Sequence, residues 1–212
     1  MSRITTVLFD FDGTIMDTND LILKSWKNTF RVLRGEEVSD DVILPTLGEP
    51  LELTMEKFFP EVPLQKCLDT YRSWHHDNFV QLIKMFPGMM QLLEELKARG
   101  YRMGLVTSRL KYTTMLGVEK YDLGRFFDYI LTADDTDKHK PDPAPILITL
   151  EKMGADPAEA IMVGDTLLDL GCARNAGVPS VLVDWTIAVP EEKKNEADYV
   201  IKKAEDLLEI LK

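Results

Sequence analysis

The chain has 212 residues, a formal net charge of −11 and 45% hydrophobic residues, values typical of a globular protein with a sizeable core. This acidic balance argues against binding along a nucleic acid backbone, which requires an extended basic surface. The two cysteines form no CxxC pair, and no stretch resembles a signal peptide or a membrane span, so we expect a cytoplasmic protein without a disulfide framework.

The first predicted element is a buried strand over residues 7–9, which ends at the sequence Asp10-Phe11-Asp12-Gly13-Thr14. Gly13 indicates a tight turn directly after the strand. Two carboxylates therefore lie at the carboxyl end of a strand, where open α/β sheets bind their ligands. Because like charges this close repel, we expect them to share a hard divalent cation, most simply Mg²⁺. The alternative is a solvated turn that happens to contain aspartates.

Residues 16–83 carry only helical patterns. Apolar residues recur at helical spacing from Leu21 to Leu33, with Gly35 as a stop signal, and again over residues 51–59 and 64–74. We expect a small all-helical module, residues 16–83, inserted after the first strand. The remaining residues, 1–15 and 84–212, would then form the core domain.

Strands and helices alternate from residue 84 onward. Regular βα alternation favours parallel pairing with right-handed crossovers, so we expect an α/β protein with a doubly wound, Rossmann-like parallel sheet. The expected strands cover residues 103–106, 129–131, 160–163, 179–183 and 199–201, and the expected helices cover residues 89–99, 112–116, 144–153 and 166–176, with a last helix from residue 204.

Hydrogen-bond donors follow two of these strands. Thr107, Ser108 and Arg109 come after residues 103–106, and hydroxyl and amide donors suit phosphate oxygens. Arg109 could contact a substrate carboxylate or second phosphate, or could form a surface salt bridge. Lys140 stands in a proline-bounded turn after residues 129–131 and offers a compact positive charge, although a lysine before proline is also common on surfaces.

Two further aspartates follow the strand over residues 160–163. Asp165 comes directly after Gly164, and Asp169 lies four residues on, which is one helical turn away on the same face. Carboxylates alone would indicate a plain cation site. The addition of Lys140 and Thr107 favours a phosphate bound beside the metal, because a phosphate needs donors on its other oxygens.

This set of residues suggests phosphoryl transfer through the protein. Asp10 can attack phosphorus to form an aspartyl-phosphate, which divides one difficult transfer into two easier ones. Asp12 can act as general acid toward the leaving oxygen and then as general base for the water that hydrolyses the intermediate.

Four motifs in this order, DxDGT at residues 10–14, an apolar run ending at Thr107, KPDP at residues 140–143 and GDTxxD at residues 164–169, resemble those of haloacid dehalogenase superfamily phosphohydrolases. The resemblance spans essentially the whole chain. It implies a mobile helical cap and a Mg²⁺ cofactor held by Asp10, Asp165 and the main-chain carbonyl of Asp12. It further implies that Asp169 is another ligand or a support for the ligands, and that Thr107 and Lys140 clamp the phosphate.

Within the superfamily, the resemblance points to phosphatases rather than dehalogenases, which lack an acidic residue at the position of Asp12. The expected substrate is a small, phosphoglycolate-like phosphate ester, with a pyrophosphatase or a β-phosphoglucomutase-type mutase as alternatives. A regulatory protein that binds a phosphate ligand without turnover also stays open, as does the choice between monomer and homodimer. Gly48 in the cap is either a point of close approach to the substrate or an ordinary loop glycine.

Overall fold

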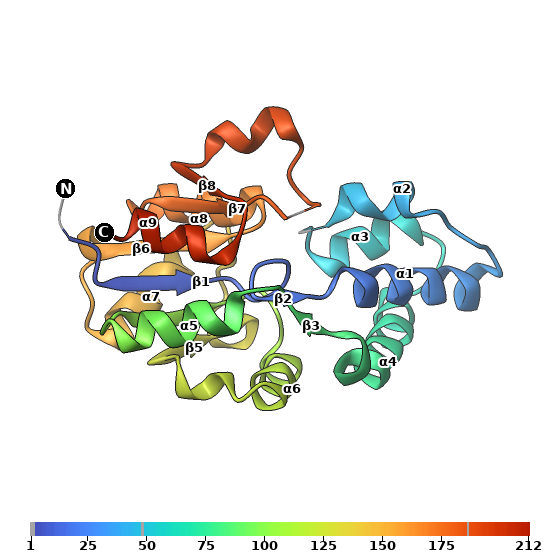
Figure 1. Cartoon of the computed structure of the whole chain (residues 1–212). Coiled ribbons are helices and arrows are strands. Elements are labelled where there is room, and N and C mark those ends of the chain that lie inside the picture. Colours follow the sequence, from blue (N-terminus) through green and yellow to red (C-terminus); the bar gives the residue numbers. More distant parts are fainter. Residues whose placement is uncertain (1–2, 48, 186) are drawn as a thin grey trace. The chain divides into compact units, whose positions relative to one another are not determined.

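The computed structural model describes residues 3–47, 49–185 and 187–212. The chain divides into two compact units, a core unit of Met1–Asp17 with Lys84–Lys212 and a helical unit of Thr18–Ile83 (Figure 1).

The core unit is built on a six-stranded sheet in which every pairing is parallel, with the strand order β5-β4-β1-β6-β7-β8. This confirms the prediction of an α/β fold with a doubly wound parallel sheet. The strands are β1 (Thr6–Phe9), β4 (Arg102–Val106), β5 (Tyr129–Leu131), β6 (Ala160–Gly164), β7 (Ser180–Val183) and β8 (Tyr199–Ile201).

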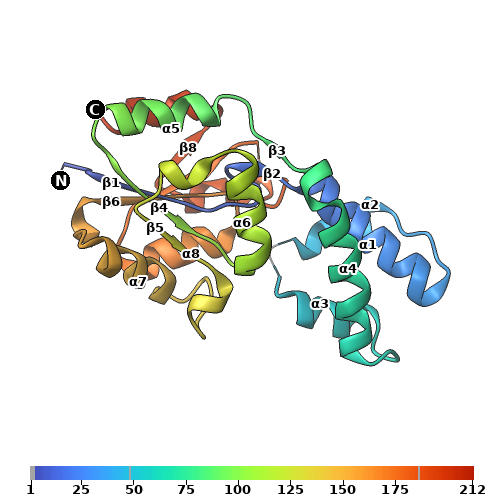
Figure 2. The ribbon, with the colours of Figure 1, turned by 90° about the horizontal axis from the view of Figure 1, so that it is seen from below.

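Helices cover both faces of this sheet. Helix α5 lies on one face, and α7 and α8 lie side by side on the other (Figure 2). The helices are α5 (Met89–Ala98), α6 (Lys111–Lys120), α7 (Ala144–Met153), α8 (Leu167–Ala176) and α9 (Leu207–Ile210). Short 3₁₀ turns connect them at η2 (Leu123–Arg125), η3 (Ala133–Asp135), η4 (Pro157–Glu159), η5 (Glu191–Glu196) and η6 (Ala204–Asp206).

Strand β1 is central, and three of its four side chains are apolar. Val7, Leu8 and Phe9 are fully buried, as expected for a strand in a sheet that helices cover on both sides. Leu8 belongs to the core cluster with Ile146 and Leu150 of α7. The buried run stops at Phe9, so the polar residues that follow it leave the core at the carboxyl end of the sheet.

A short antiparallel pair, β2 (Met16–Asp17) with β3 (Lys84–Met85), was not predicted. The prediction that residues 16–83 contain no strand is therefore wrong at its first two residues. Two-residue strands leave no alternation of polar and apolar residues to detect. The pair forms because the loop before it folds back tightly, with the Met16 and Ile15 amides donating to the carbonyl of Phe11.

The helical unit contains four α-helices and one 3₁₀ turn among the described residues: α1 (Asn19–Arg34), α2 (Asp40–Ile43), η1 (Leu44–Thr46), α3 (Leu51–Phe58) and α4 (Leu64–Leu82). As predicted, the apolar face of α1 is core and the helix ends at Gly35, whose φ is 69°. Aromatic rings fill this core, with the Trp26 and Phe58 centroids 5.4 Å apart and those of Phe30 and Phe59 4.7 Å apart.

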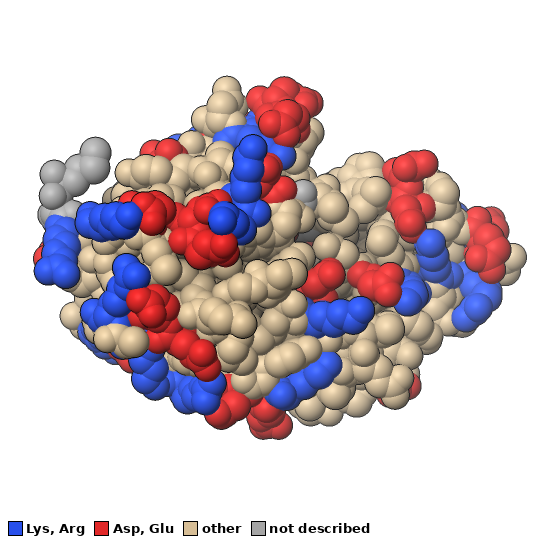
Figure 3. Space-filling model, in the orientation of Figure 1, with Lys and Arg blue, Asp and Glu red and all other residues tan. Residues whose placement is uncertain are grey.

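On the face shown in Figure 3, lysines and arginines are interspersed with aspartates and glutamates rather than gathered into one basic area. Within the described part of the chain, no helix combines the length and the apolar composition needed to cross a membrane.

Candidate functional site

The register of the sheet brings three predicted site residues to neighbouring strand ends. Strand β1 lies between β4 and β6, with Phe9 opposite both Leu105 and Val163. The Asp10 amide donates to the carbonyl of Val163 over 2.9 Å, which continues the ladder by one residue. Asp10, Thr107 and Asp165 are therefore the first residues after three adjacent strands, at the carboxyl end of the sheet.

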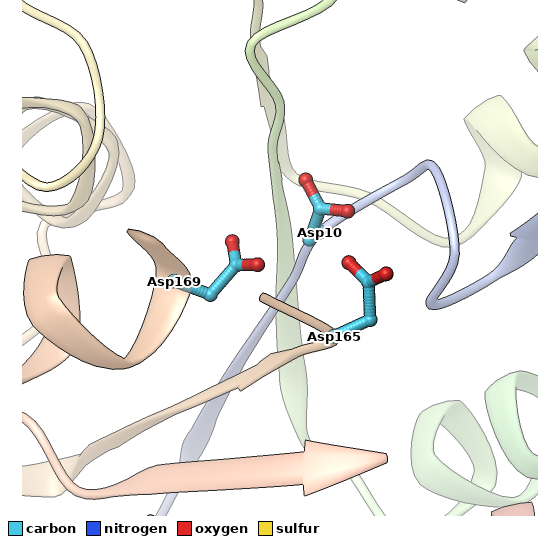
Figure 4. A group of neighbouring side chains, drawn as sticks. All are labelled: Asp10, Asp165 and Asp169. Carbon is cyan, nitrogen blue, oxygen red and sulfur yellow. The ribbon is translucent and has the colours of Figure 1, made fainter. Parts of the chain in front are cut away.

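Three buried carboxylates meet at this end of the sheet. Asp10, Asp165 and Asp169 are 7%, 8% and 2% exposed, and one oxygen from each lies within 4.8 Å of the others. Figure 4 shows the three side chains converging from the ends of β1 and β6 and from the first turn of α8. Carboxylate oxygens in such a group are the ligands that hard divalent cations prefer.

Lys140 contacts two of these carboxylates. Its Nζ donates to Oδ1 of Asp10 over 2.7 Å and to Oδ1 of Asp169 over 2.6 Å. The alternative of an ordinary surface lysine is wrong, since Lys140 is only 8% exposed. Its turn is held against α8 by Asn175, which donates to the carbonyl of Pro141 over 2.9 Å. Lys140 is thus a fixed positive charge beside Asp10.

Asp169 uses both of its oxygens within the protein. Oδ2 accepts the Thr166 amide over 3.0 Å and the Thr166 hydroxyl over 2.6 Å, while Oδ1 accepts from Lys140. This is a capping box at the start of α8, which satisfies amides that a helix N-terminus leaves without partners. The hydrogen bonds of this capping box orient Asp169 and therefore help to orient Lys140.

Asp12 forms a two-point ion pair with Arg109. The Arg109 Nε donates to Oδ2 over 2.7 Å and Nη2 donates to Oδ1 over 2.8 Å. The Arg109 side chain is 9% exposed and that of Asp12 is 26% exposed. Arg109 therefore forms a salt bridge, as one of its two predicted alternatives has it, but the pair is part-buried and its partner is a residue of the first motif.

Burial and like charge perturb the titration of the cluster. Burial, together with the charges of Asp169 and Asp12, raises the pKa of Asp10 to about 7, even though Lys140 acts in the opposite direction. Burial and the charges of Asp10 and Asp169 also raise the pKa of Asp165 well above its ordinary value. Burial alone would lower the pKa of Lys140, but the adjacent carboxylates raise it, so this lysine stays charged.

The charges of the site fit a divalent cation. Four carboxylates, those of Asp10, Asp12, Asp165 and Asp169, lie with two cationic side chains, which leaves a formal excess of two negative charges. Lys140 and Arg109 do not offset this excess. A cation of charge two with oxygen ligands would do so.

Two glycines make the carboxylate cluster sterically possible. A Cβ on Gly13, whose φ is +76°, would lie 2.0 Å from Oδ2 of Asp165, and a Cβ on Gly164 would lie 2.3 Å from the Cβ of Asp169. The sequence predicted Gly13 only as a turn residue, and the role of Gly164 was not predicted. The Trp185 indole, which also was not predicted, donates to the carbonyl of Gly13 over 3.2 Å and covers the turn.

The remaining predicted residues differ in their placement. Thr107 is buried at 3% exposure, and its hydroxyl accepts the Arg109 amide over 3.1 Å. Ser108 is exposed, and its predicted role in substrate binding stays a prediction. Gly48 lies outside the described residues, so its predicted role in substrate binding stays a prediction.

The chain is similar to known proteins over nearly its whole length. The family model described as haloacid dehalogenase-like hydrolase matches residues 7–183. The protein named pyrophosphatase PpaX from Bacillus velezensis is 37% identical over 212 residues, covering 98% of this chain and 96% of its own. The one with that name from Bacillus cereus is 35% identical, covering 99% and 97%. A solved structure described as a predicted phosphoglycolate phosphatase from Haemophilus somnus covers both chains fully with a TM-score of 0.88, but at 19% identity it shows a shared fold alone.

Proposed function

The chain belongs to the haloacid dehalogenase-like hydrolase family, and on that premise we propose that it is a Mg²⁺-dependent phosphohydrolase working through an aspartyl-phosphate intermediate. Family membership confirms the resemblance drawn from the four motifs. The observation that carries the proposal is the group formed by Asp10, Lys140 and Asp165, in which a nucleophile, a cation and a second carboxylate lie at one sheet edge.

Asp10 is the proposed nucleophile. Its carboxylate attacks phosphorus, the bond from phosphorus to the leaving oxygen breaks, and Asp12 supplies the proton to that oxygen. In the second step Asp12 takes a proton from water, the water oxygen bonds to phosphorus, and the acyl phosphate bond to Asp10 breaks to release inorganic phosphate. Lys140 and Thr107 would bind the phosphoryl oxygens, whose negative charge calls for directed donors.

The metal would be held by Asp10, Asp165 and the main-chain carbonyl of Asp12. Asp169 already accepts hydrogen bonds from Thr166 and Lys140. It would therefore help to orient the metal ligands more than it would bind the metal itself. When bound, Mg²⁺ supplies charge neutralisation for the phosphoryl oxygens. The raised pKa values of Asp10 and Asp165 support the need for a cation, because the nucleophile must be ionised to react.

The domain assignment is part of the same proposal. In the predicted division, residues 1–15 and 84–212 form the catalytic core domain and residues 16–83 form a cap domain that excludes bulk water during reaction. The two compact units differ from this division only at residues 16 and 17, which belong to the core unit. Substrate selection by the cap, including the role expected for Gly48, belongs to this proposal as well.

Two substrates of one chemical class stand out. The sequence favours a phosphoglycolate-like ester, whereas the relatives that match nearly the full chain are named pyrophosphatases, which favours inorganic pyrophosphate. Both are small, and both carry a second anionic group beside the scissile bond. We therefore propose hydrolysis of a small phosphate compound with a second anion, with pyrophosphate tested first.

A phosphate-release screen tests this proposal. Purified protein is assayed with pyrophosphate, phosphoglycolate, nucleotides and sugar phosphates, with Mg²⁺ and with EDTA. We expect release that requires Mg²⁺ and falls by at least about 1000-fold in Asp10→Asn, as expected when a nucleophile is removed. Asp20→Asn, which changes an exposed aspartate in the helical unit, serves as the matched control and should act like the wild type.

Several outcomes would contradict the proposal. Release that persists in Asp10→Asn would exclude an aspartyl-phosphate at this residue. Binding of phosphate compounds without any release would favour the regulatory alternative. Conversion of β-glucose 1-phosphate to glucose 6-phosphate with a diphosphate primer, without net phosphate release, would identify the mutase alternative instead.

A further inference from the structure

We propose that Arg109 is the residue that selects substrates with a second anionic group, by exchanging Asp12 for that group when substrate binds. This inference rests on the proposed function, since it concerns the leaving-group side of the same site. Its starting observation is the two-point pair between the Arg109 guanidinium and the Asp12 carboxylate.

The geometry of the pair shows what Arg109 is shaped to bind. A guanidinium that donates through Nε and Nη2 to two oxygens of one group presents a planar fork, which matches a carboxylate and a phosphate equally well. In this structure the group in the fork is Asp12. The carboxylate of phosphoglycolate or the distal phosphate of pyrophosphate offers the same two-oxygen pattern.

The position of the pair places the fork beside the leaving group. Asp12 is the residue proposed to protonate the leaving oxygen, so a guanidinium that holds Asp12 lies on that side of the scissile bond. Lys140, the other cation of the site, instead contacts Asp10 and Asp169. The two cations therefore have separate roles. Lys140 binds the transferred phosphoryl group, and Arg109 binds the leaving group.

The loop that carries Arg109 is fixed by neighbouring segments. The Arg109 amide donates to the Thr107 hydroxyl over 3.1 Å, and its carbonyl accepts the Ala133 amide over 3.0 Å. The Lys111 amide, two residues further along the chain, donates to the Asp134 carboxylate over 2.5 Å. Arg109 is thus held by the segment after β5 and is preorganised for a directed contact, unlike an exposed arginine on a mobile stem.

The difference in exposure within the pair favours exchange. Asp12 is 26% exposed and can be solvated once its partner leaves, whereas the Arg109 side chain is 9% exposed and needs an anion to replace the one it loses. A substrate whose leaving group carries no second anion cannot supply that replacement, so Arg109 stays on Asp12. Selection for the second anion follows from this asymmetry.

Kinetics with matched leaving groups test the inference. Pyrophosphate and phosphoglycolate, which carry a second anion, are compared with p-nitrophenyl phosphate, which does not. Phosphate and p-nitrophenolate are both weakly basic leaving groups, so their need for a proton is similar and this pair is the matched comparison. The alkoxide that leaves phosphoglycolate is strongly basic and depends on a proton from Asp12. We expect Arg109→Met to lower kcat/KM for pyrophosphate and phosphoglycolate by at least about 100-fold, because two charge-assisted hydrogen bonds are lost, and that for p-nitrophenyl phosphate by less than about 5-fold.

Two further variants sharpen the result. Arg109→Lys keeps the charge without the fork and should restore only part of the loss. Arg99→Met, which removes an exposed arginine paired with Glu95 on α5, is the matched control and should change none of the three rates. A loss confined to pyrophosphate would assign the fork to a second phosphate. A loss confined to phosphoglycolate, the one substrate here whose leaving alkoxide needs a proton, would point to the general acid Asp12 and would overturn the inference. An equal loss for all three substrates would overturn the inference.

Absence of turnover would contradict the proposed function but would not by itself contradict the role of Arg109. Binding measurements test that role without turnover. In an Asp10→Asn background, calorimetric titration with pyrophosphate and with orthophosphate compares an anion pair with a single anion. We expect addition of Arg109→Met to weaken pyrophosphate binding by about 100-fold and orthophosphate binding by less than about 5-fold. Equal weakening of both would refute selection by Arg109.

Discussion

Replacement of Gly13 by alanine should separate the geometry of the carboxylate cluster from the stability of the fold. Gly13 has a φ of +76°, and a Cβ at this position would lie 2.0 Å from Oδ2 of Asp165. Ordinary van der Waals contacts begin near 3.4 Å. In Gly13→Ala the Asp165 carboxylate must therefore retreat by more than one ångström, in addition to the backbone strain of a left-handed alanine.

The two effects have different magnitudes. A left-handed conformation costs a residue with a Cβ roughly 1–2 kcal/mol. Alanine also has less conformational freedom than glycine in the unfolded chain, which favours folding and offsets about 0.4–1 kcal/mol of this cost. We expect the free energy of unfolding to fall by at least about 1 kcal/mol. Displacement of a catalytic group by about 1 Å lowers a rate by roughly 100-fold, which is the expected effect on phosphate release.

Gly177→Ala is the matched control. Gly177 follows α8 with a φ of +70°, and nothing lies within 4 Å of its missing Cβ. Urea unfolding should show a loss of about 1 kcal/mol for Gly177→Ala and at least as large a loss for Gly13→Ala, in which the displacement of Asp165 adds to the backbone strain. Phosphate release should stay near the wild-type rate in Gly177→Ala and fall only in Gly13→Ala. If Gly13→Ala hydrolyses substrate as fast as Gly177→Ala, the position of Asp165 does not matter to catalysis and the reasoning fails.

Two further predictions concern α8 and the thiols. Thr166→Ala removes the N-cap that bonds Asp169 and should lower the free energy of unfolding in urea by about 1 kcal/mol, while Thr166→Ser should recover most of it; equal stability of the alanine variant would contradict the capping role. Burial raises the pKa of Cys172 to about 11 and also raises that of Cys67, so both thiols should resist a thiol-specific reagent at pH 8 in the folded protein. After denaturation both should label, and rapid labelling of the folded protein would contradict their burial.

Local patterns in the sequence were sufficient for the main elements of the fold. The fully apolar run of β1 identified a central strand, and helical spacing with the stop at Gly35 identified α1, because burial and backbone conformation depend on nearby residues there. The strands β2 and β3 escaped detection because two residues show no period, and they exist only as partners of each other.

The candidate site could also be predicted only in part from the sequence. The order of strand ends carrying Asp10, Thr107, Lys140 and Asp165 can be seen in the sequence, since parallel strands deliver their carboxyl ends to one edge. The partner of Arg109 could not be seen, because Asp12 lies 97 residues away and the pairing depends on the register of β1 against β4.

The sequence by itself therefore determined which residue types reach the edge of the sheet, because hydrophobic periodicity and strand order set this for any sheet of this topology. Only the tertiary structure decided which cation faces which carboxylate oxygen, Lys140 with Asp10 and Asp169, and Arg109 with Asp12. Such pairings depend on atomic distances between segments far apart in the chain, and electrostatic and hydrogen-bond energies change steeply over those distances.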